Sequence, residues 1–185
     1  MNLPNKLTIL RIVFIPFYVF FVLTDFFALS SVAALVIYAA ACLTDLFDGK
    51  IARARNLVTD FGKFADPLAD KMLVMSAMVS FVALGRLPAW VCIIILAREF
   101  AISGFRLIAA GKGVVIAASK WGKYKTVFQM SMCILMTLDI ERLGGGGKFL
   151  KVYNIFTAVI MYIALALTII SLIDYFYKNR KSFSM

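Results

Sequence analysis

Two runs of the chain, Phe26–Leu43 and Met72–Gly85, contain no charged residue, although several aspartates lie in the segment between them. Uncharged apolar runs are typical of helices that cross the hydrocarbon core of a membrane, which takes about 20 residues per span. Of the 185 residues, 63% are hydrophobic, and the mean hydropathy of +0.92 lies well outside the range of soluble domains. The sequence therefore predicts an integral membrane protein.

Six segments qualify as membrane-spanning helices, and we expect one all-α domain over residues 1–185. The six are Leu7–Leu23, Phe26–Leu43, Gly62–Leu84, Leu87–Ala110, Thr126–Ile140 and Val152–Tyr175. The first is interpreted as a retained span rather than a signal peptide, because it contains Arg11 and no small-residue cleavage site follows it. The third and fifth are uncharged only over Met72–Leu84 and Thr126–Thr137, so we expect their polar flanks to line a polar cavity.

The distribution of basic residues orients these helices, because cytoplasmic segments carry the excess of Lys and Arg. With both termini in the cytoplasm, the outside holds only Arg86, Arg142, Lys148 and Lys151, and the other 16 of the 20 basic residues lie inside. Any site formed by the aspartates then faces the cytoplasm, at the cytoplasmic membrane of the cell. The net charge of +10 suits anionic membrane lipids and gives no reason to invoke nucleic acid. Gly144–Gly147 is interpreted as an external loop rather than a phosphate-binding loop.

The aspartates recur at helical spacing in two stretches. In the first, positions i, i+3, i+4 and i+7 hold Asp45, Asp48, Gly49 and Ala52; in the second, positions i, i+4 and i+8 hold Gly62, Asp66 and Asp70. Each stretch would present two carboxylates on one helix face. Pro67 leaves two possibilities for the second stretch: a helix kinked at this residue, or a helix that starts with Asp66 as its cap.

Four converging carboxylates next to hydrocarbon need compensating positive charge, because each costs roughly 2.5–3.5 kcal/mol there. Two divalent cations would supply it, and an all-oxygen ligand set suits Mg²⁺ or Mn²⁺. The chain has no histidine, and Cys42, Cys92 and Cys133 lie singly in apolar runs. Carboxylates are therefore the only candidate metal ligands and general bases. Paired metals of this kind promote displacement at phosphorus.

Two other interpretations of the aspartates are less favoured. A solvated cytoplasmic loop, salt-bridged to neighbours such as Lys50 and Lys63, would not place its acids at helical spacing beside small residues. A cation transporter normally binds its ion near the middle of the bilayer and often contains internal repeats. Here the acids lie at predicted cytoplasmic helix ends, and no repeat is visible.

The pattern D-x2-D-G-x2-A-R-x8-G-x3-D-x3-D, which runs from Asp45 to Asp70, resembles the signature of the CDP-alcohol phosphatidyltransferases. All eight fixed residues and every spacing are present. The resemblance implies a six-helix, homodimeric membrane enzyme. Such an enzyme would move a phosphatidyl group from a CDP-linked lipid, here CDP-diacylglycerol, to an alcohol and release CMP.

The resemblance also implies roles for the signature residues. Two metal ions would be bound by Asp45, Asp48, Asp66 and Asp70. Asp70 would in addition be the general base that accepts the proton of the acceptor hydroxyl. The nucleotide part of the CDP-lipid would be bound by Asp48, Gly49, Ala52, Arg53 and Gly62. Arg53 would meet a phosphate through its planar guanidinium.

Further motifs, spread over about residues 2–130, resemble the branch of this family that uses glycerol 3-phosphate as acceptor and forms phosphatidylglycerophosphate. They are Asn2-Leu3-Pro4-Asn5 with Thr8 and Arg11, Asp66–Lys71, Ala97–Phe100 with Gly104 and Arg106, and Gly122–Thr126 with Gln129.

Basic residues in and near the predicted fourth and fifth helices favour that acceptor, because glycerol 3-phosphate is a dianion. The candidate ligands of its phosphate are Arg98, Arg106, Lys123 and Lys125. An arginine within an apolar segment is a functional candidate by default. Two alternatives stay open: these cations only set the topology and bind lipid headgroups, or the acceptor is serine or an inositol phosphate.

Overall fold

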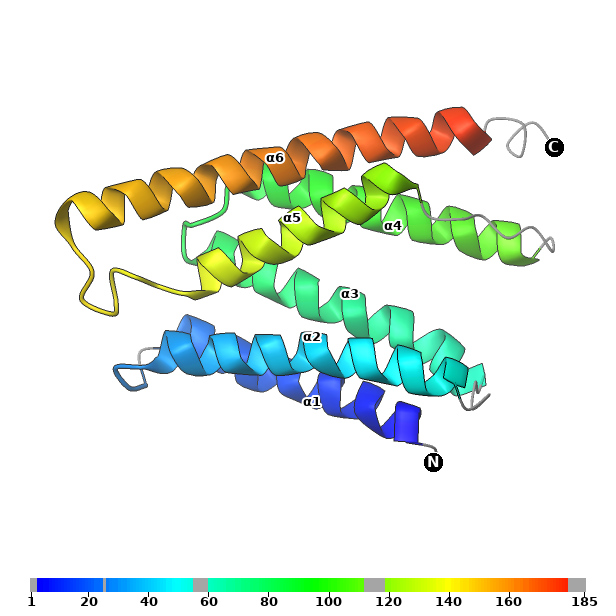
Figure 1. The fold of residues 1–185 in the computed structure, drawn as a ribbon, viewed down its shortest axis with the longest axis horizontal. Helices are drawn as coiled ribbons and strands as arrows, with labels where there is room; N and C mark the ends of the chain where they lie inside the picture. The colour runs from blue at the N-terminus through cyan, green and yellow to red at the C-terminus, as the bar shows by residue number, and fades with distance from the viewer. Residues whose placement is uncertain (1–2, 25, 55–59, 112–118, 180–185) are drawn as a thin grey trace. The chain divides into compact units, whose positions relative to one another are not determined.

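The computed structural model describes residues 3–24, 26–54, 60–111 and 119–179; it describes their side chains except those of residues 3–4, 45–54, 60–64, 66 and 67. All regular secondary structure in these ranges is helical (Figure 1). The helices are α1 (Leu3–Leu23), α2 (Ser30–Ala54), α3 (Asp60–Ala83), α4 (Ala89–Gly111), α5 (Lys120–Thr137) and α6 (Gly147–Asn179). The predicted all-α class is confirmed for the described residues.

Two of the described helices are long and apolar enough to cross a membrane on their own. They are Asn5–Leu23 within α1 and the whole of α6, while Ser30–Thr44 within α2 is a shorter apolar helix. Large apolar side chains, among them Ile93, Leu107 and Ile155, are exposed on the helix surfaces. Exposed apolar surface of this extent is typical of a protein that contacts lipid.

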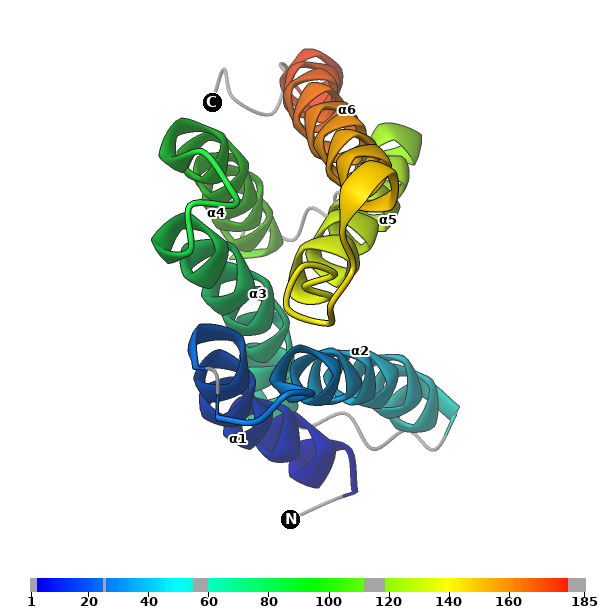
Figure 2. The ribbon, with the colours of Figure 1, turned by 90° about the vertical axis from the view of Figure 1, so that its left-hand side faces the viewer.

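The chain forms two compact units, which we describe separately. Unit 1 comprises Met1–Arg86 and Cys133–Gly146, and unit 2 comprises Leu87–Met132 and Gly147–Met185. In unit 1, α1 packs against both α2 and α3, and α2 runs back along α1 (Figures 1 and 2). Ala34 and Ala41 of α2 and Ala69 of α3 are fully buried, because small side chains allow helix backbones to approach closely.

Two tyrosines lie at the centre of unit 1. The rings of Tyr18 in α1 and Tyr38 in α2 have centroids 5.5 Å apart. The hydroxyl of Tyr18 is also hydrogen-bonded to Oγ1 of Thr137, at the end of α5, over 2.9 Å. The ring contact fixes the register of α1 along α2, and the hydrogen bond ties α1 to the end of α5.

In unit 2, α4 packs against α6, and the first part of α5 belongs to the same unit. Val91 and Ile95 of α4 are fully buried, as are Ala164 and two hydroxyl residues of α6, Thr168 and Ser171. The hydroxyl groups of Thr168 and Ser171 donate to carbonyl oxygens of their own helix. Thr168 Oγ1, for example, donates to the carbonyl oxygen of Ala164 over 2.7 Å.

Several helix boundaries differ from the predicted ones, because capping residues rather than hydropathy set them. α2 begins at Ser30 instead of Phe26, and Ser30 Oγ accepts the N–H of Phe27 over 3.0 Å. α5 begins at Lys120 instead of Thr126, because Ser119 Oγ accepts the N–H of Gly122 over 3.1 Å as an N-cap. α6 is longer than predicted at both ends.

The region of Pro67 settles one of the open alternatives. α3 starts at Asp60 and continues through Pro67 to Ala83, so a helix that begins with Asp66 as its cap is wrong. α2 likewise continues to Ala54, through the first acidic stretch. Both stretches of the signature therefore lie on helices, as their spacing predicted.

The end of α3 is a tight turn that only a residue with positive φ fits well. Gly85 has φ +69°, its N–H donates to Val82 over 3.0 Å, and the N–H of Arg86 donates to Phe81 over 2.9 Å. This pair of backbone bonds is the Schellman ending of a helix, in which glycine occupies the left-handed position. The turn satisfies two helix carbonyls that the chain would otherwise leave without a backbone partner.

Candidate active site

The acidic signature maps onto the end of α2 and the beginning of α3. These two helix ends lie at the same end of unit 1 as the start of α1 (Figures 1 and 2). Seven signature residues are described only as parts of these helices: Asp45, Asp48, Gly49, Ala52, Arg53, Gly62 and Asp66. The predicted roles of these seven in metal and nucleotide binding therefore stay predictions.

Asp70 is the signature residue whose side chain the structure describes. It is partly exposed, between the buried residues Ala69 and Leu73 of the same helix. A carboxylate in this setting is fixed by the packing of its helix and still accessible to a ligand. The described side chains contain no group of three or more acidic or cysteine residues that could hold a metal ion. The chemistry of the complete set of four carboxylates nevertheless fits hard divalent cations.

A polar face of α1 is buried at the same end of unit 1. Asn5, Thr8 and Arg11 are buried there, and Arg11 has an exposed fraction of 0%. Tyr18 and Tyr38 oppose each other across the antiparallel helices, so Arg11 on α1 is level with Asp45 on α2, each seven positions further toward this end. A buried guanidinium at this level contributes positive charge to the acidic end of unit 1. The sequence indicated this face only through the resemblance.

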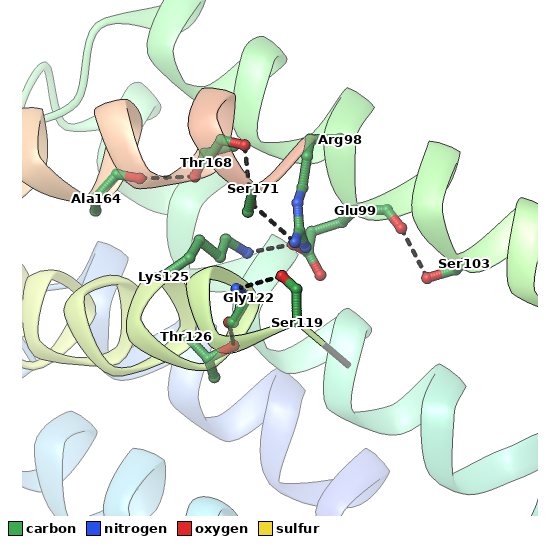
Figure 3. A network of polar contacts seen from close by, with 10 residues as sticks. All are labelled: Arg98, Glu99, Ser103, Ser119, Gly122, Lys125, Thr126, Ala164, Thr168 and Ser171. Carbon is green, nitrogen blue, oxygen red and sulfur yellow. Dashed lines mark hydrogen bonds and ion pairs between the residues drawn. The ribbon is translucent and has the colours of Figure 1, made fainter. Parts of the chain in front are cut away.

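A second group of candidate residues forms a network of polar contacts in unit 2, shown in Figure 3. We call it the Arg98 cluster; its members are Arg98, Glu99, Lys125 and Ser171. Arg98 Nη1 donates to Glu99 Oε1 over 2.7 Å, and Lys125 Nζ forms an ion pair with the same oxygen. Arg98 Nη2 donates to Oγ of Ser171 over 3.0 Å. Three helices, α4, α5 and α6, therefore meet in one network of charged and polar contacts.

The first turn of α5 lies beside this network. A Cβ added to Gly122 would be 3.6 Å from Arg98 Nη2, so the backbone of this turn passes close to the guanidinium. The N-terminus of a helix carries partial positive charge and favours anions. Two basic side chains and a helix N-terminus together form a setting in which a phosphate group can be bound.

The four predicted phosphate ligands are not all brought together. Arg98 and Lys125 share a carboxylate oxygen, as described above. Arg106 and Lys123 are exposed, and within the part of the chain that the structure describes neither forms an ion pair with an acidic side chain. Whether these two contact a bound acceptor stays a prediction.

Ser171 is a member of the Arg98 cluster that the sequence did not indicate. The resemblance extended only to about residue 130, and α6 was interpreted as an apolar helix. One signal could have indicated a functional face: Thr157, Thr168, Ser171 and Tyr175 recur at helical spacing within the apolar run. All four are buried.

Comparison with known proteins agrees with the acidic signature. The family model for CDP-alcohol phosphatidyltransferase matches residues 1–170. The chain is 38% identical to the CDP-diacylglycerol–glycerol-3-phosphate 3-phosphatidyltransferase of Bacillus subtilis, over 96% of this chain and 95% of that protein. It is 38% identical to the Rickettsia felis protein of the same description, over 98% and 97%. It is 39% identical to a probable phosphatidylglycerophosphate synthase of Mycobacterium tuberculosis, over 94% and 79%.

Proposed function

The chain belongs to the CDP-alcohol phosphatidyltransferase family, and from this premise we propose that it is an enzyme that transfers the phosphatidyl group of CDP-diacylglycerol to glycerol 3-phosphate. The products are phosphatidylglycerophosphate and CMP. The observation that carries this proposal is the complete eight-residue signature, on two helices, in a chain whose relatives of this description align along nearly its whole length.

The reaction is a displacement at the phosphorus that carries the diacylglycerol. The primary hydroxyl oxygen of glycerol 3-phosphate bonds to this phosphorus, and the bond from phosphorus to the bridging oxygen of CMP breaks. Asp70 accepts the hydroxyl proton on its carboxylate. Its partial exposure supports this role, because a general base must reach the proton that it abstracts.

The other signature residues hold the donor substrate. Asp45, Asp48 and Asp66, together with Asp70, would bind two divalent cations, Mg²⁺ or Mn²⁺. When bound, such ions supply charge neutralisation at the phosphoryl oxygens. Gly49, Ala52 and Gly62 let the nucleotide approach the helix backbones, with Asp48 beside them, and Arg53 donates hydrogen bonds to a phosphate.

The acceptor phosphate binds to basic residues of unit 2. Arg98 and Lys125 form the core of this site, with support from the contacts of the Arg98 cluster. Lys123 and Arg106 are exposed and attract the dianion from solvent.

We place the protein in the cytoplasmic membrane as a single domain with six spans and both termini inside. The supports are the excess of basic residues in the segments assigned to the cytoplasm and the two helices that can each cross a membrane. In this topology the active site faces the cytoplasm, in contact with membrane lipids, where water-soluble glycerol 3-phosphate is available. A homodimer is expected for a member of this family.

The test is a CMP-release assay on the purified protein with CDP-diacylglycerol and one acceptor at a time. We expect turnover with glycerol 3-phosphate, no turnover with serine or inositol phosphate, and loss of activity when a chelator removes divalent cations. Mg²⁺ or Mn²⁺ added in excess should restore the rate. Turnover with serine but not with glycerol 3-phosphate would overturn the choice of acceptor.

A further inference from the structure

A single carboxylate oxygen joins the two basic side chains of the Arg98 cluster. Glu99 Oε1 accepts hydrogen bonds from Arg98 Nη1 and from Lys125 Nζ (Figure 3). Lys125 is exposed by only 2%, so its charge is largely removed from water. Two cations held this close in such surroundings repel each other, and a carboxylate between them offsets the repulsion. The cluster keeps a net charge of +1.

The hydroxyl of Ser171 fixes the other arm of Arg98. Ser171 Oγ donates its proton to the carbonyl oxygen of Thr168 over 2.9 Å and accepts from Arg98 Nη2 over 3.0 Å. Because the proton is committed to the helix backbone, a lone pair of the oxygen is free to accept from the guanidinium. Ser171 is fully buried and belongs to α6, so this contact fixes the guanidinium relative to a second helix.

The guanidinium held in this way retains an unused donor. Arg98 Nε is buried and has no hydrogen-bond partner among the described residues. A buried N–H without a partner is costly, and native structures normally satisfy it with a ligand or with water. The capped first turn of α5 lies beside the same guanidinium. These observations indicate an anion site whose geometry is fixed before the anion arrives.

We propose that Glu99 and Ser171 are positioning residues for the acceptor phosphate. Glu99 holds Arg98 and Lys125 together, and Ser171 holds the orientation of Arg98, so that both cations meet the phosphate of glycerol 3-phosphate without rearrangement. The inference rests on the proposed function and deepens it. Ser171 also lies outside the segment that the family model matches, which ends at residue 170.

The first experiment replaces the carboxylate. Glu99→Gln keeps the shape of the side chain and removes its charge, so Lys125 and Arg98 lose the negative charge that they share. The KM for glycerol 3-phosphate should rise about tenfold, the effect of losing one charged hydrogen bond, while kcat and the KM for CDP-diacylglycerol stay within about twofold. Glu99→Asp should recover part of the loss. The matched control is Glu141→Gln, which neutralises an exposed glutamate of unit 1.

The second experiment removes the hydroxyl. Ser171→Ala should raise the KM for glycerol 3-phosphate by about threefold, because a hydrogen bond from a charged donor to a neutral acceptor is lost. Ser131→Ala is the matched control, since among the described residues the Ser131 hydroxyl bonds to the carbonyl of Val127 on its own helix. The folding of Glu99→Gln is checked by its melting temperature and its elution volume in detergent. If this variant does not fold, Ser171→Ala still tests the positioning role.

Two results would overturn the positioning role. An unchanged KM for glycerol 3-phosphate in both variants is one. A lower KM in Glu99→Gln is the other, because the carboxylate would then compete with the phosphate for the cations. Failure of the proposed function can be distinguished from failure of the positioning role. If the wild-type protein used inositol phosphate instead of glycerol 3-phosphate, the proposed acceptor would be wrong. The same comparison of KM values, made with inositol phosphate, would still test the positioning role.

Discussion

Asp70 combines two properties at the scale of a single residue: its carboxylate can be reached, and its backbone is held by the buried residues Ala69 and Leu73. Replacing it by asparagine removes the proton acceptor and leaves the shape. We expect Asp70→Asn to slow CMP release by about 100-fold or more while CDP-diacylglycerol binding stays within a few fold. The rate and the binding are measured separately, the latter by titration without acceptor.

The control for this variant is Asp174→Asn, which changes an aspartate of α6 that pairs with Lys178 on the same helix. It should turn over like wild type. Wild-type rates in Asp70→Asn would remove Asp70 from the role of base.

Arg11 has the largest fully buried side chain among the described residues, and this side chain is charged. A guanidinium is tolerated in such a place only when other groups compensate it. Arg11→Met should therefore lower the free energy of unfolding by about 3–5 kcal/mol, as expected when one partner of a buried charged contact is removed. The measurement is thermal or denaturant unfolding of the detergent-solubilised protein.

Lys6→Met is the comparison for Arg11→Met, because it removes an exposed positive charge from the same helix. Its effect should stay within about 0.5 kcal/mol. Equal stabilities of the two variants would show that the buried position of Arg11 has no energetic role.

At the scale of the helix, the turn after α3 depends on one backbone conformation. Gly85 has φ +69°, and no atom lies within 4 Å of the position that a Cβ would take. The cost of Gly85→Ala is therefore conformational rather than steric, and we expect a loss of about 1 kcal/mol of stability. Melting temperatures report the effect. Gly104→Ala, inside α4 with equally open space, should be neutral or slightly stabilising; a similar loss there would contradict the explanation.

All six helices could be predicted from apolar runs and helical spacing, but their ends could not. Hydropathy does not detect the first two turns of α5, which contain Lys120, Lys123 and Lys125. The helix begins there because Ser119 caps it. Pro67 was ambiguous for a similar reason: a proline removes one backbone donor whether it starts a helix or lies inside one. Caps and turns depend on a few specific bonds, which a search for long apolar runs passes over.

At the scale of the whole molecule, the charge distribution predicts which ends are accessible from which side. In a protein whose Cys42, Cys92 and Cys133 are replaced by alanine, a single cysteine introduced as Gly146→Cys should react with a membrane-impermeant maleimide in intact cells. Lys178→Cys should react only after permeabilisation. Both positions are exposed, so access is decided by the membrane. Labelling of Lys178→Cys in intact cells would reverse the proposed orientation.

The two groups of candidate residues, one in each unit, were predictable to different degrees. The carboxylates recur at the spacing of a helix, so the sequence alone indicates that they share helix faces. The Arg98 cluster combines α4, α5 and α6, and its members are up to 73 positions apart in the chain. Arg98 and Lys125 could be identified because basic residues are rare in apolar segments. Ser171 could not, because a serine in an apolar helix is unremarkable until its partner is known.

The contact between Ser171 and Arg98 makes the rotation of α6 about its own axis a functional quantity. Successive residues of an α-helix are rotated by about 100° about the helix axis. Inserting one alanine in the middle of α6 would therefore turn Ser171 away from the guanidinium, with almost no change in the hydropathy of the helix. Substitutions on the exposed face of α6, at Ile155 or Ile173, leave that rotation unchanged. We therefore expect α6 to tolerate substitutions on its exposed face but to lose the contact between Ser171 and Arg98 when a residue is inserted or deleted.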